Sequence, residues 1–416
     1  MILRSLYLLL FLSCIFDPSD LILGLKVPIF VILFLYSIVL GKYSMNNRRL
    51  LSYVFLFSIV LPIVSFCIGY ITNMENYDKP NLFGAIKPYL FLFFAFSFQS
   101  DIKLRNDIIN IFAYSLLALS ITIIILLTLF TLDLVPFEVL YSFGDQNVLY
   151  SIGDRSYGAF SINRVYFHSS PMLVFSLCYF LNEFFDQKRK VFLCMALVTS
   201  VSLFISGTRN NMIMSILPYI VMFYINGNKK IKKCVIAFSI IGFVYLLSQE
   251  VVLALFDKTE TSNDTKLGMF ANYDVAFSNI RTLLLGDGLD SYFYTERGRV
   301  NNTELTYFEL LRRFGLWGTI AYIFLMFKPA WGLLHRKDCR WLGLSYLLYL
   351  VMIISNPFFF SSNGMVILSI VLVSYYNKVL GRLQTNPTHQ RSLETNVERN
   401  GEVLLQEKTQ ITTRSG

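Results

Sequence analysis

The sequence predicts an all-α polytopic membrane protein, and its composition, its apolar runs and the placement of its charges all indicate this fold class. Hydrophobic residues make up 55% of the 416 residues and charged residues only 15%, whereas a soluble domain carries about 25% charged residues. The 39 Phe and 25 Tyr suit a bilayer, where aromatic rings pack against lipid and gather at both interfaces. This composition excludes a water-soluble enzyme and a largely disordered chain.

Twelve apolar runs are long enough to cross the hydrocarbon core of a bilayer. We expect transmembrane helices near residues 2–16, 21–40, 51–72, 82–99, 108–132, 166–185, 191–206, 211–226, 232–256, 307–327, 341–356 and 363–380. The first run is not followed by the small-residue cleavage site of a secretory signal. Residues 1–380 are therefore expected to form one transmembrane domain, and the polar residues 381–416 a disordered cytoplasmic tail.

Lysines and arginines gather in alternate connections between these runs. Counted from a cytoplasmic N-terminus, 16 of them lie in the short inner connections at 42–49, 100–107, 186–190, 226–233 and 328–340. The outer connections at 17–20 and 355–362 hold none. Because basic connections stay in the cytoplasm, we predict that both termini are cytoplasmic. Two long loops, at 133–165 and 257–306, then lie outside, the larger between helices 9 and 10.

The same charge pattern and the scarcity of ligand residues exclude several functions. The net charge of +9 lies mostly in the connections and forms no basic stripe, so we expect no nucleic-acid partner. The six Cys show no CxxC or paired spacing, and the three His are dispersed without HExxH. We therefore predict neither a disulfide framework nor a metal site. No GxxxxGK[ST] motif is present, and we expect no cofactor.

The larger outer loop contains an amphipathic stretch. Phe270, Tyr273, Phe277, Ile280 and Leu284 recur at helical spacing. A helix with one apolar face beside a membrane lies along the membrane–water interface. We expect such a helix on the outer surface.

Arg209 lies in the turn SGTR between two apolar runs, on the side where the charge distribution predicts no arginine. It is either an interfacial arginine that reaches lipid headgroups or a phosphate ligand, since guanidinium binds phosphate oxygens in bidentate fashion. Gly207 permits a tight turn that opens a helix, and a helix N-terminus also favours anions. The turn is therefore a predicted anion site.

A second polar segment, at 283–318, runs from a Gly-rich turn into the tenth apolar run. Arg312 and Arg313 lie about one turn inside the outer end of that helix, where charge is costly. Glu309 is three and four residues from them, so a local ion pair is one interpretation and substrate binding the other. Glu304 precedes the apolar run and is either a carboxylate near the helix N-terminus or a partly desolvated general base.

In this order and spacing, the two segments resemble the O-antigen polymerase and ligase superfamily, which contains the Wzy-type repeat-unit polymerases and the WaaL-type ligases. The family pattern is an SGSR-like turn, a loop arginine about twenty residues before PLxGxG, and HNxYLELLxxxGLLG. This chain has SGTR (206–209), LLLGDG (283–288) and ELTYFELLRRFGLWG (304–318). The resemblance implies a GT-C-like membrane fold and a lipid-linked sugar donor.

The resemblance also implies roles for single residues. Arg209 matches the arginine of the turn, and Lys266, twenty residues before Gly286, stands where the loop arginine is expected. These two would hold the pyrophosphate of the donor. Glu304 occupies the position of the family's histidine, which activates the acceptor hydroxyl, and Leu305 replaces the asparagine. The missing histidine favours a polymerase over a ligase.

Further substrate contacts are predicted around this site. Arg281 lies in the same outer loop, and Tyr307 could stack on a sugar ring. His168 is expected to open the sixth helix with Arg164 one turn earlier, either as a substitute base or as a hydrogen-bonded interfacial histidine. Lys87, near the outer end of the fourth helix, is either a phosphate contact or a lysine that reaches the interface.

The expected function is a metal-independent glycosyltransferase in the bacterial inner membrane, which polymerises undecaprenyl-pyrophosphate-linked oligosaccharide repeat units into O-antigen or a related polysaccharide. The alternatives are an O-antigen ligase that transfers the polysaccharide to lipid A-core, and a repeat-unit flippase. The centres of the apolar runs are nearly free of charge, which disfavours a transporter. Expected partners are membrane lipid, the lipid-linked oligosaccharides, a chain-length regulator and a flippase.

Overall fold

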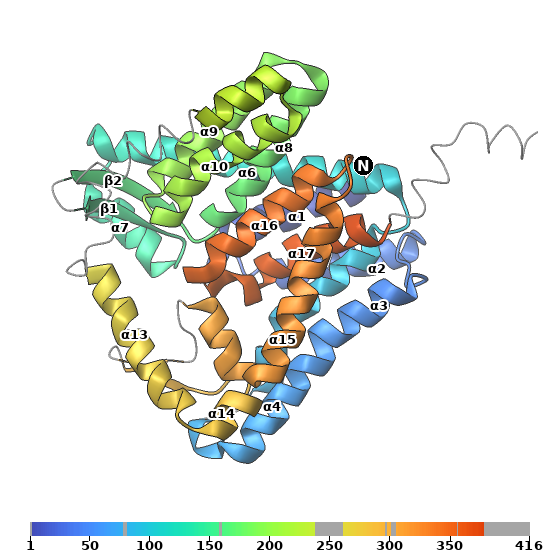
Figure 1. The fold of residues 1–416 in the computed structure, drawn as a ribbon, viewed down its shortest axis with the longest axis vertical. Helices are drawn as coiled ribbons and strands as arrows, with labels where there is room; N and C mark the ends of the chain where they lie inside the picture. Colours follow the sequence, from blue (N-terminus) through green and yellow to red (C-terminus); the bar gives the residue numbers. More distant parts are fainter. Residues whose placement is uncertain are drawn as a thin grey trace, which may run out of the picture.

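The computed structural model describes residues 2–77, 81–157, 160–237, 261–295, 298–300, 305–355 and 357–377. In these ranges the chain is a bundle of helices with two small antiparallel hairpins (Figure 1). The predominantly helical fold confirms the sequence-based expectation at this level. The two hairpins were not predicted.

Most helices coincide with the predicted apolar runs. The first half of the chain contributes α1 (Ile2–Phe16), α2 (Lys26–Val39), α3 (Arg48–Phe55), a π-helical turn (Leu56–Val60), α4 (Leu61–Thr72), α5 (Leu82–Leu90) with a 3-10 continuation (Phe91–Ser97), and α6 (Ile102–Thr131). The second half contributes α8 (Leu173–Gln187), α9 (Lys190–Ile205), α10 (Arg209–Asn226), α15 (Thr306–Leu334), α16 (Arg340–Met352) and α17 (Ser362–Tyr376). The predicted run at 232–256 is helical as far as 237, and its remainder lies outside the described residues.

Length and composition support a membrane location. Among the described residues, three helices are long and apolar enough to cross a membrane, at Arg48–Thr72, Ile102–Thr131 and Thr306–Leu334. Six further apolar helices have 10–17 residues. The number of twelve spans stays a prediction.

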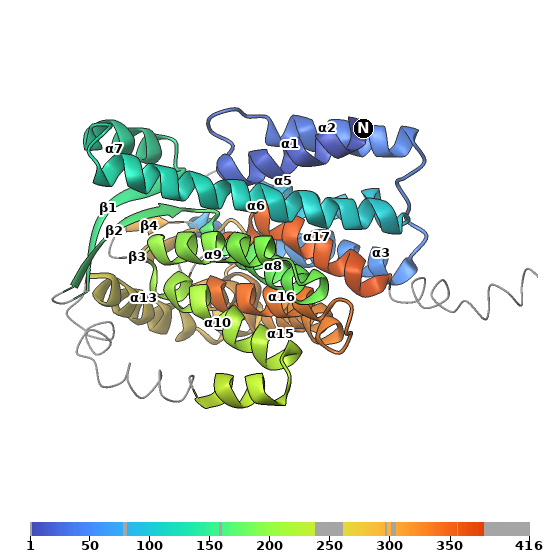
Figure 2. The ribbon, with the colours of Figure 1, turned by 90° about the horizontal axis from the view of Figure 1, so that it is seen from above.

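The two ends of the bundle differ. Figure 2 shows α7 (Phe137–Gln146), β1 (Tyr150–Tyr157), β2 (Phe160–Phe167) and α13 (Thr261–Phe277) at one end, called here the hairpin end. The N-terminus and the last turn of α17 lie at the opposite, N-terminal end. There, Lys42 Nζ donates to Asp101 Oδ2 at 2.8 Å and Asn377 Nδ2 to the Gln99 carbonyl at 2.6 Å. The connections at 42–49 and 100–107 and the end of α17 thus lie at one end of the bundle. Their side of the membrane stays a prediction.

The outer loop at 133–165 is folded rather than irregular. β1 and β2 pair antiparallel, with Tyr150 opposite Phe167 and Ile152 opposite Val165. These four side chains share one face of the hairpin and are buried, at 5% exposure or less. Residues 166 and 167, which were expected to begin the sixth helix, therefore belong to a strand, and α8 begins only at Leu173.

The larger outer loop contains α13 and α14 (Ile280–Leu285), followed by β3 (Phe293–Thr295) and β4 (Gly298–Val300). The amphipathic stretch is helical as predicted, but it is two helices. The break falls where Asn279 caps α14 by accepting a hydrogen bond from the Arg281 backbone N–H at 3.0 Å. An asparagine at this position competes with helix continuation and favours a new N-terminus.

A reciprocal pair of tyrosine hydrogen bonds fastens the α3–α4 segment to α15. The Tyr322 hydroxyl donates to the Phe57 carbonyl at 3.0 Å, and the Tyr53 hydroxyl donates to the Leu325 carbonyl. Phe57 lies in the π-helical turn, where the backbone ladder is displaced and carbonyl groups need other partners. Away from water an unpaired carbonyl is costly, so these bonds align α15 with the bundle.

Candidate functional site

Three segments that are distant in the sequence meet around the last turn of α16 at the hairpin end. Asn210 Nδ2, at the start of α10, donates to the Met352 carbonyl at 3.3 Å. The Tyr307 hydroxyl, at the start of α15, donates to the Leu350 carbonyl at 3.1 Å. The side chain of Arg164 from β2 lies against the turn that precedes α10. The starts of α10 and α15 thus meet the end of α16, and β2 lies against the turn before α10; we call this arrangement the hairpin-end site.

The SGTR turn opens α10 in the way its residues predict. Thr208 is the N-cap, and its hydroxyl accepts a hydrogen bond from the Asn211 backbone N–H at 3.3 Å. Asn211 Nδ2 in turn donates to Ser206 Oγ at 2.7 Å. Gly207 has φ +65°, and a Cβ there would lie 2.8 Å from Arg164 Cβ, so the residue must be glycine for both reasons. Arg209, the first residue of α10, is half-buried beside this contact.

Arg164 and His168 lie near the site, but His168 does not open a helix as predicted, because α8 begins only at Leu173. Arg164 is in β2 opposite Gly153, and His168 follows the strand in a turn, where its backbone N–H donates to the Leu149 carbonyl at 3.1 Å. Burial lowers the pKa of His168 below its ordinary value, which favours the neutral imidazole. The β-branched and aromatic residues at 165–167 explain the strand.

Glu309 binds two arginines in the first turns of α15. Its Oε1 accepts from Arg312 Nη2 at 2.7 Å and from Arg313 Nε at 2.5 Å. Its Oε2 accepts from the Tyr273 hydroxyl of α13 at 3.1 Å. Arg312 is fully buried and also donates to Ser291 Oγ at 2.8 Å. The predicted local ion pair is confirmed, and this burial favours a structural role for Arg312. Substrate binding by Arg312 and Arg313 stays a prediction.

The LLLGDG turn holds a kink in α15. Gly315 has φ +64° and ψ −177°, which interrupts the helix and removes the usual partners of the preceding carbonyls. The backbone N–H groups of Asp287 and Gly288 donate to the Arg312 and Arg313 carbonyls at 2.6 and 3.2 Å. Ser65 Oγ of α4 adds a bond of 2.7 Å to the Arg313 carbonyl. The turn therefore supplies the hydrogen bonds that the kink removes and fixes the direction in which α15 leaves the site.

Arg281 belongs to a polar network behind this turn. It donates to Asn73 Oδ1, and Asn73 Nδ2 donates to Asp287 Oδ1 at 2.9 Å. Thr282 Oγ1 also donates to Asp287 Oδ1, at 2.8 Å. Burial raises the pKa of Asp287, and nearby Arg312 opposes this effect without cancelling it. The substrate role of Arg281 stays a prediction.

The three remaining residues predicted to bind substrate or act as base lie in different parts of the chain. Lys87 is exposed on α5, just before Pro88. Lys266 lies on α13. Glu304 lies outside the described residues, although its neighbour Leu305 is buried against Met269 and Tyr273. The base and phosphate roles of these residues stay predictions.

Sequence reasoning missed the polar partners that hold the site together. Asn73 and Ser291 have no motif around them, and the LLLGDG motif assigns no role to its Asp287. Asn73 bonds Asp287 more than two hundred positions away, and Ser291 bonds Arg312 of α15. The hairpin carried a detectable signal, because Tyr150, Ile152, Val165 and Phe167 alternate with polar residues. Its strands fall in residues predicted as an outer loop (133–165) and the start of a helix (from 166).

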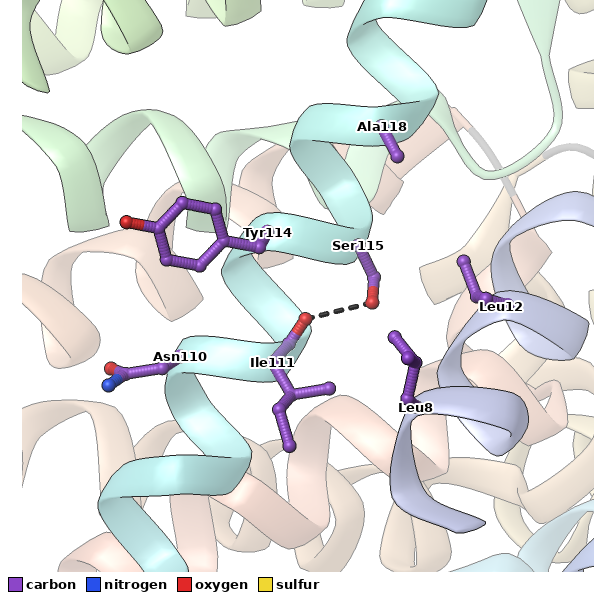
Figure 3. Close-up of a pocket in the computed structure, with 7 residues that line it drawn as sticks. All are labelled: Leu8, Leu12, Asn110, Ile111, Tyr114, Ser115 and Ala118. Carbon is purple, nitrogen blue, oxygen red and sulfur yellow. Dashed lines mark hydrogen bonds between the residues drawn. The ribbon is translucent and has the colours of Figure 1, made fainter. Parts of the chain in front are cut away.

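A cavity of about 300 Å³ lies elsewhere, between the middles of α1 and α6 (Figure 3). Leu8 and Leu12 face Ile111 and Ser115 across it, and Ser115 Oγ donates to the Ile111 carbonyl at 2.8 Å. Its walls are mainly aliphatic and present no catalytic carboxylate or base. Among the described residues, no group of three or more His, Cys, Asp or Glu could hold a metal ion.

The fold and site together describe a predominantly helical protein with apolar helices suited to a membrane and a polar site at one end of its bundle. No protein-family model matches the chain, and a search of curated proteins finds no similar sequence.

Proposed function

We propose that the protein is a membrane-embedded glycosyltransferase of the Wzy type, which joins undecaprenyl-pyrophosphate-linked repeat units into a surface polysaccharide. The observation that carries the proposal is the convergence of the SGTR turn and the start of α15 on the end of α16. These are the segments in which the sequence resembles the polymerase superfamily. Asn210 and Tyr307 bind carbonyls two residues apart in α16 although about one hundred positions separate them in the chain.

The arrangement supports nucleophilic displacement at an anomeric carbon. The hydroxyl of the acceptor sugar attacks this carbon and forms the new glycosidic bond, while the bond to undecaprenyl pyrophosphate breaks with its electron pair. Glu304 takes the hydroxyl proton as general base. Arg209, Arg164 and Lys266 stabilise the charge that develops on the leaving pyrophosphate, because guanidinium and ammonium groups bind phosphate oxygens.

In the proposed orientation the hairpin end faces outward and the N-terminal end faces the cytoplasm, in a chain of twelve spans across the inner membrane. The basic connections around Lys42 and Arg336 lie at the N-terminal end, in keeping with the positive-inside rule. Lipid-linked repeat units would then reach the site from the outer leaflet.

A deletion strain tests this function. Polysaccharide banding should collapse to a single repeat unit attached to its final acceptor. A full ladder of chains not attached to lipid A-core would support the ligase instead. Lipid-linked units retained on the cytoplasmic leaflet would support the flippase.

The general base is tested by Glu304→Gln, which keeps the shape of the side chain and removes the proton acceptor. We expect chain extension to fall by about 10²-fold or more, with normal protein levels. Long chains in Glu304→Gln together with their loss in His168→Ala would assign the base to His168.

A further inference from the structure

The cavity between α1 and α6 belongs to a longer stripe along these two helices. Toward the N-terminal end of the bundle, Arg4 of α1 donates to Asp107 of α6. Leu8 and Leu12 follow on α1 at intervals of four residues, which places them on the same helix face as Arg4. They line the cavity together with residues of α6 as far as Ala118 (Figure 3). We call the stripe from the Arg4–Asp107 pair to Ala118 the α1–α6 groove.

The length and the walls of this groove suit a lipid chain. Asp107 and Ala118 are eleven residues apart in one helix, which corresponds to about 16 Å. This is half of a bilayer core of about 30 Å, so the groove extends through one leaflet. Its cavity of about 300 Å³ is open on one side and mainly aliphatic, and it is as large as a small ligand-binding site.

Asn110 places an amide group on the wall of the groove, at a depth where polar groups are costly. The Tyr179 hydroxyl of α8 donates to its Oδ1 at 2.8 Å, which directs the oxygen toward α8. Within the ranges that the structure describes, the exposed Nδ2 group has no acceptor. An unpaired donor in hydrocarbon costs free energy. The groove therefore offers one hydrogen bond to a ligand, and the ester carbonyl of a phospholipid lies at this depth below its phosphate.

The end of the groove at the Arg4–Asp107 pair is basic. The side chain of Arg4 is 53% exposed although it is paired with Asp107. Lys103 lies one turn before Asp107 on the same face of α6 and is also exposed. These three residues leave a net charge of +1 on the two helices. The last turns of α8 add two carboxylates and the connection at 188–190 adds three cations, so the charge stays positive and complements a phosphate group.

We propose that the α1–α6 groove binds one anionic phospholipid. One acyl chain lies along Leu8 and Leu12, and an ester carbonyl accepts from Asn110 Nδ2. The phosphate binds Arg4 and Lys103, since basic sites between membrane helices recognise anionic headgroups. A lipid that binds both helices in the folded state stabilises their pairing. This inference goes beyond the proposed glycosyltransferase, because the groove does not include the hairpin-end site.

The test is native mass spectrometry of the purified, delipidated protein. It is titrated with phosphatidylglycerol, which carries one negative charge, and with zwitterionic phosphatidylcholine. One phosphatidylglycerol should bind at saturation, about 5-fold more tightly than phosphatidylcholine. Arg4→Gln should abolish this preference, because it removes the positive charge of the pair.

Two tryptophan variants test the place of the acyl chain. Leu8→Trp fills the groove and should weaken phosphatidylglycerol binding by at least about 10-fold. Leu9→Trp is the matched control, because Leu9 is 49% exposed on the same helix and does not line the cavity. It should bind within about 2-fold of wild type. If Leu8→Trp does not fold, Ala118→Phe fills the other end of the groove and should have the same effect.

Asn110→Leu removes the amide donor and should weaken binding about 5-fold. Tyr179→Phe removes the same hydrogen bond between α6 and α8 but keeps the donor, so affinity should fall by at most about 2-fold. An equal loss in both variants would overturn the amide contact. Lipid binding without saturation, or wild-type affinity in the groove-filling variant, would reduce the groove to ordinary bilayer contact and overturn the proposal. A dimer that Leu8→Trp dissociates would assign the groove to a second copy of the chain instead.

Discussion

At the scale of single residues, the Glu309 carboxylate illustrates how charge is accommodated inside the bundle. It is 3% exposed and accepts hydrogen bonds from two guanidinium groups and a phenol. Buried ions are tolerated when they are paired and their hydrogen-bonding groups are satisfied, and removal of one partner leaves an uncompensated charge. The carboxylate therefore joins α13 to the first turns of α15, which carry Tyr307.

Glu309→Gln should destabilise the protein by about 3 kcal/mol, because the fully buried Arg312 loses its counter-ion. Unfolding by heat or denaturant in detergent measures the effect. Glu138→Gln, an exposed substitution on α7, is the control and should change stability by less than about 0.5 kcal/mol. Equal stability of the two variants would show that the ion pair contributes nothing.

Asp287 is expected to make stability depend on pH in the direction opposite to that of a paired carboxylate. Burial raises its folded-state pKa above the ordinary 3.8, so the unfolded chain ionises first as pH rises. The stability of the folded state is therefore greatest below the ordinary pKa and is lost as pH rises through the folded-state value.

Asp287→Asn keeps the Oδ1 acceptor for Asn73 and Thr282 and carries no charge. Its Tm at about pH 7.5 should equal or exceed that of wild type, and should change less between about pH 4 and 7.5. Thermal unfolding across this range tests the prediction. A Tm several degrees below wild type at the higher pH would mean that the charged carboxylate is stabilising.

At the scale of elements, the kink at Gly315 and the LLLGDG turn depend on each other. A Cβ on Gly315 would collide with the Leu284 carbonyl, and a Cβ on Gly286 would lie 2.6 Å from the Arg313 carbonyl oxygen. Both glycines also have positive φ. Two backbone segments thus approach each other at positions where only glycine fits.

Gly315→Ala should cost at least about 2 kcal/mol of stability, since it adds a steric overlap to backbone strain. Gly24→Ala is the matched control. Gly24 has φ +59°, but a Cβ on this residue would meet no atom within 4 Å. Gly24→Ala should therefore lose only the stability that backbone strain costs, about 1 kcal/mol. Chemical denaturation of both variants separates the two contributions, and equal losses would argue against a close approach.

Elements with strong periodic or apolar signals were predictable, and elements that depend on tertiary contacts were not. The helices from α1 to α6 and from α15 to α17 follow the apolar runs closely, because a run of apolar residues in a membrane forms a helix to satisfy its own backbone. The β1–β2 hairpin is local and left a detectable alternation in the sequence, whereas the kink at Gly315 depends on the turn at 286–288 and on Ser65 of α4. Arg209 and Tyr307 were singled out from motifs, whereas the roles of Asn73 and Ser291 became visible only in three dimensions.

At the scale of the whole molecule, the proposed orientation can be tested with cysteine labelling. In a background with the exposed Cys67, Cys194 and Cys234 replaced by serine, Asp154→Cys reports on the hairpin end and Lys337→Cys on the N-terminal end. Both positions are exposed. A membrane-impermeant maleimide should label Asp154→Cys in intact cells and Lys337→Cys only after lysis. The reverse pattern would invert the topology and place the site in the cytoplasm.

The central claim is that the hairpin-end site polymerises lipid-linked repeat units and that Arg209 binds their pyrophosphate. Arg209→Lys keeps the charge and loses the planar fork that binds phosphate in bidentate fashion. Arg189→Lys, an exposed arginine before α9, is the control.

The most direct measurement is the product ladder made by the purified, reconstituted protein from lipid-linked repeat units of the deletion strain. Wild type and Arg189→Lys should build long chains and release undecaprenyl pyrophosphate, while Arg209→Lys, with an unchanged Tm, should leave most units single. Failure of the wild-type protein to extend any chain would contradict the proposed function. Wild-type ladders from Arg209→Lys would return this arginine to a role at the lipid interface.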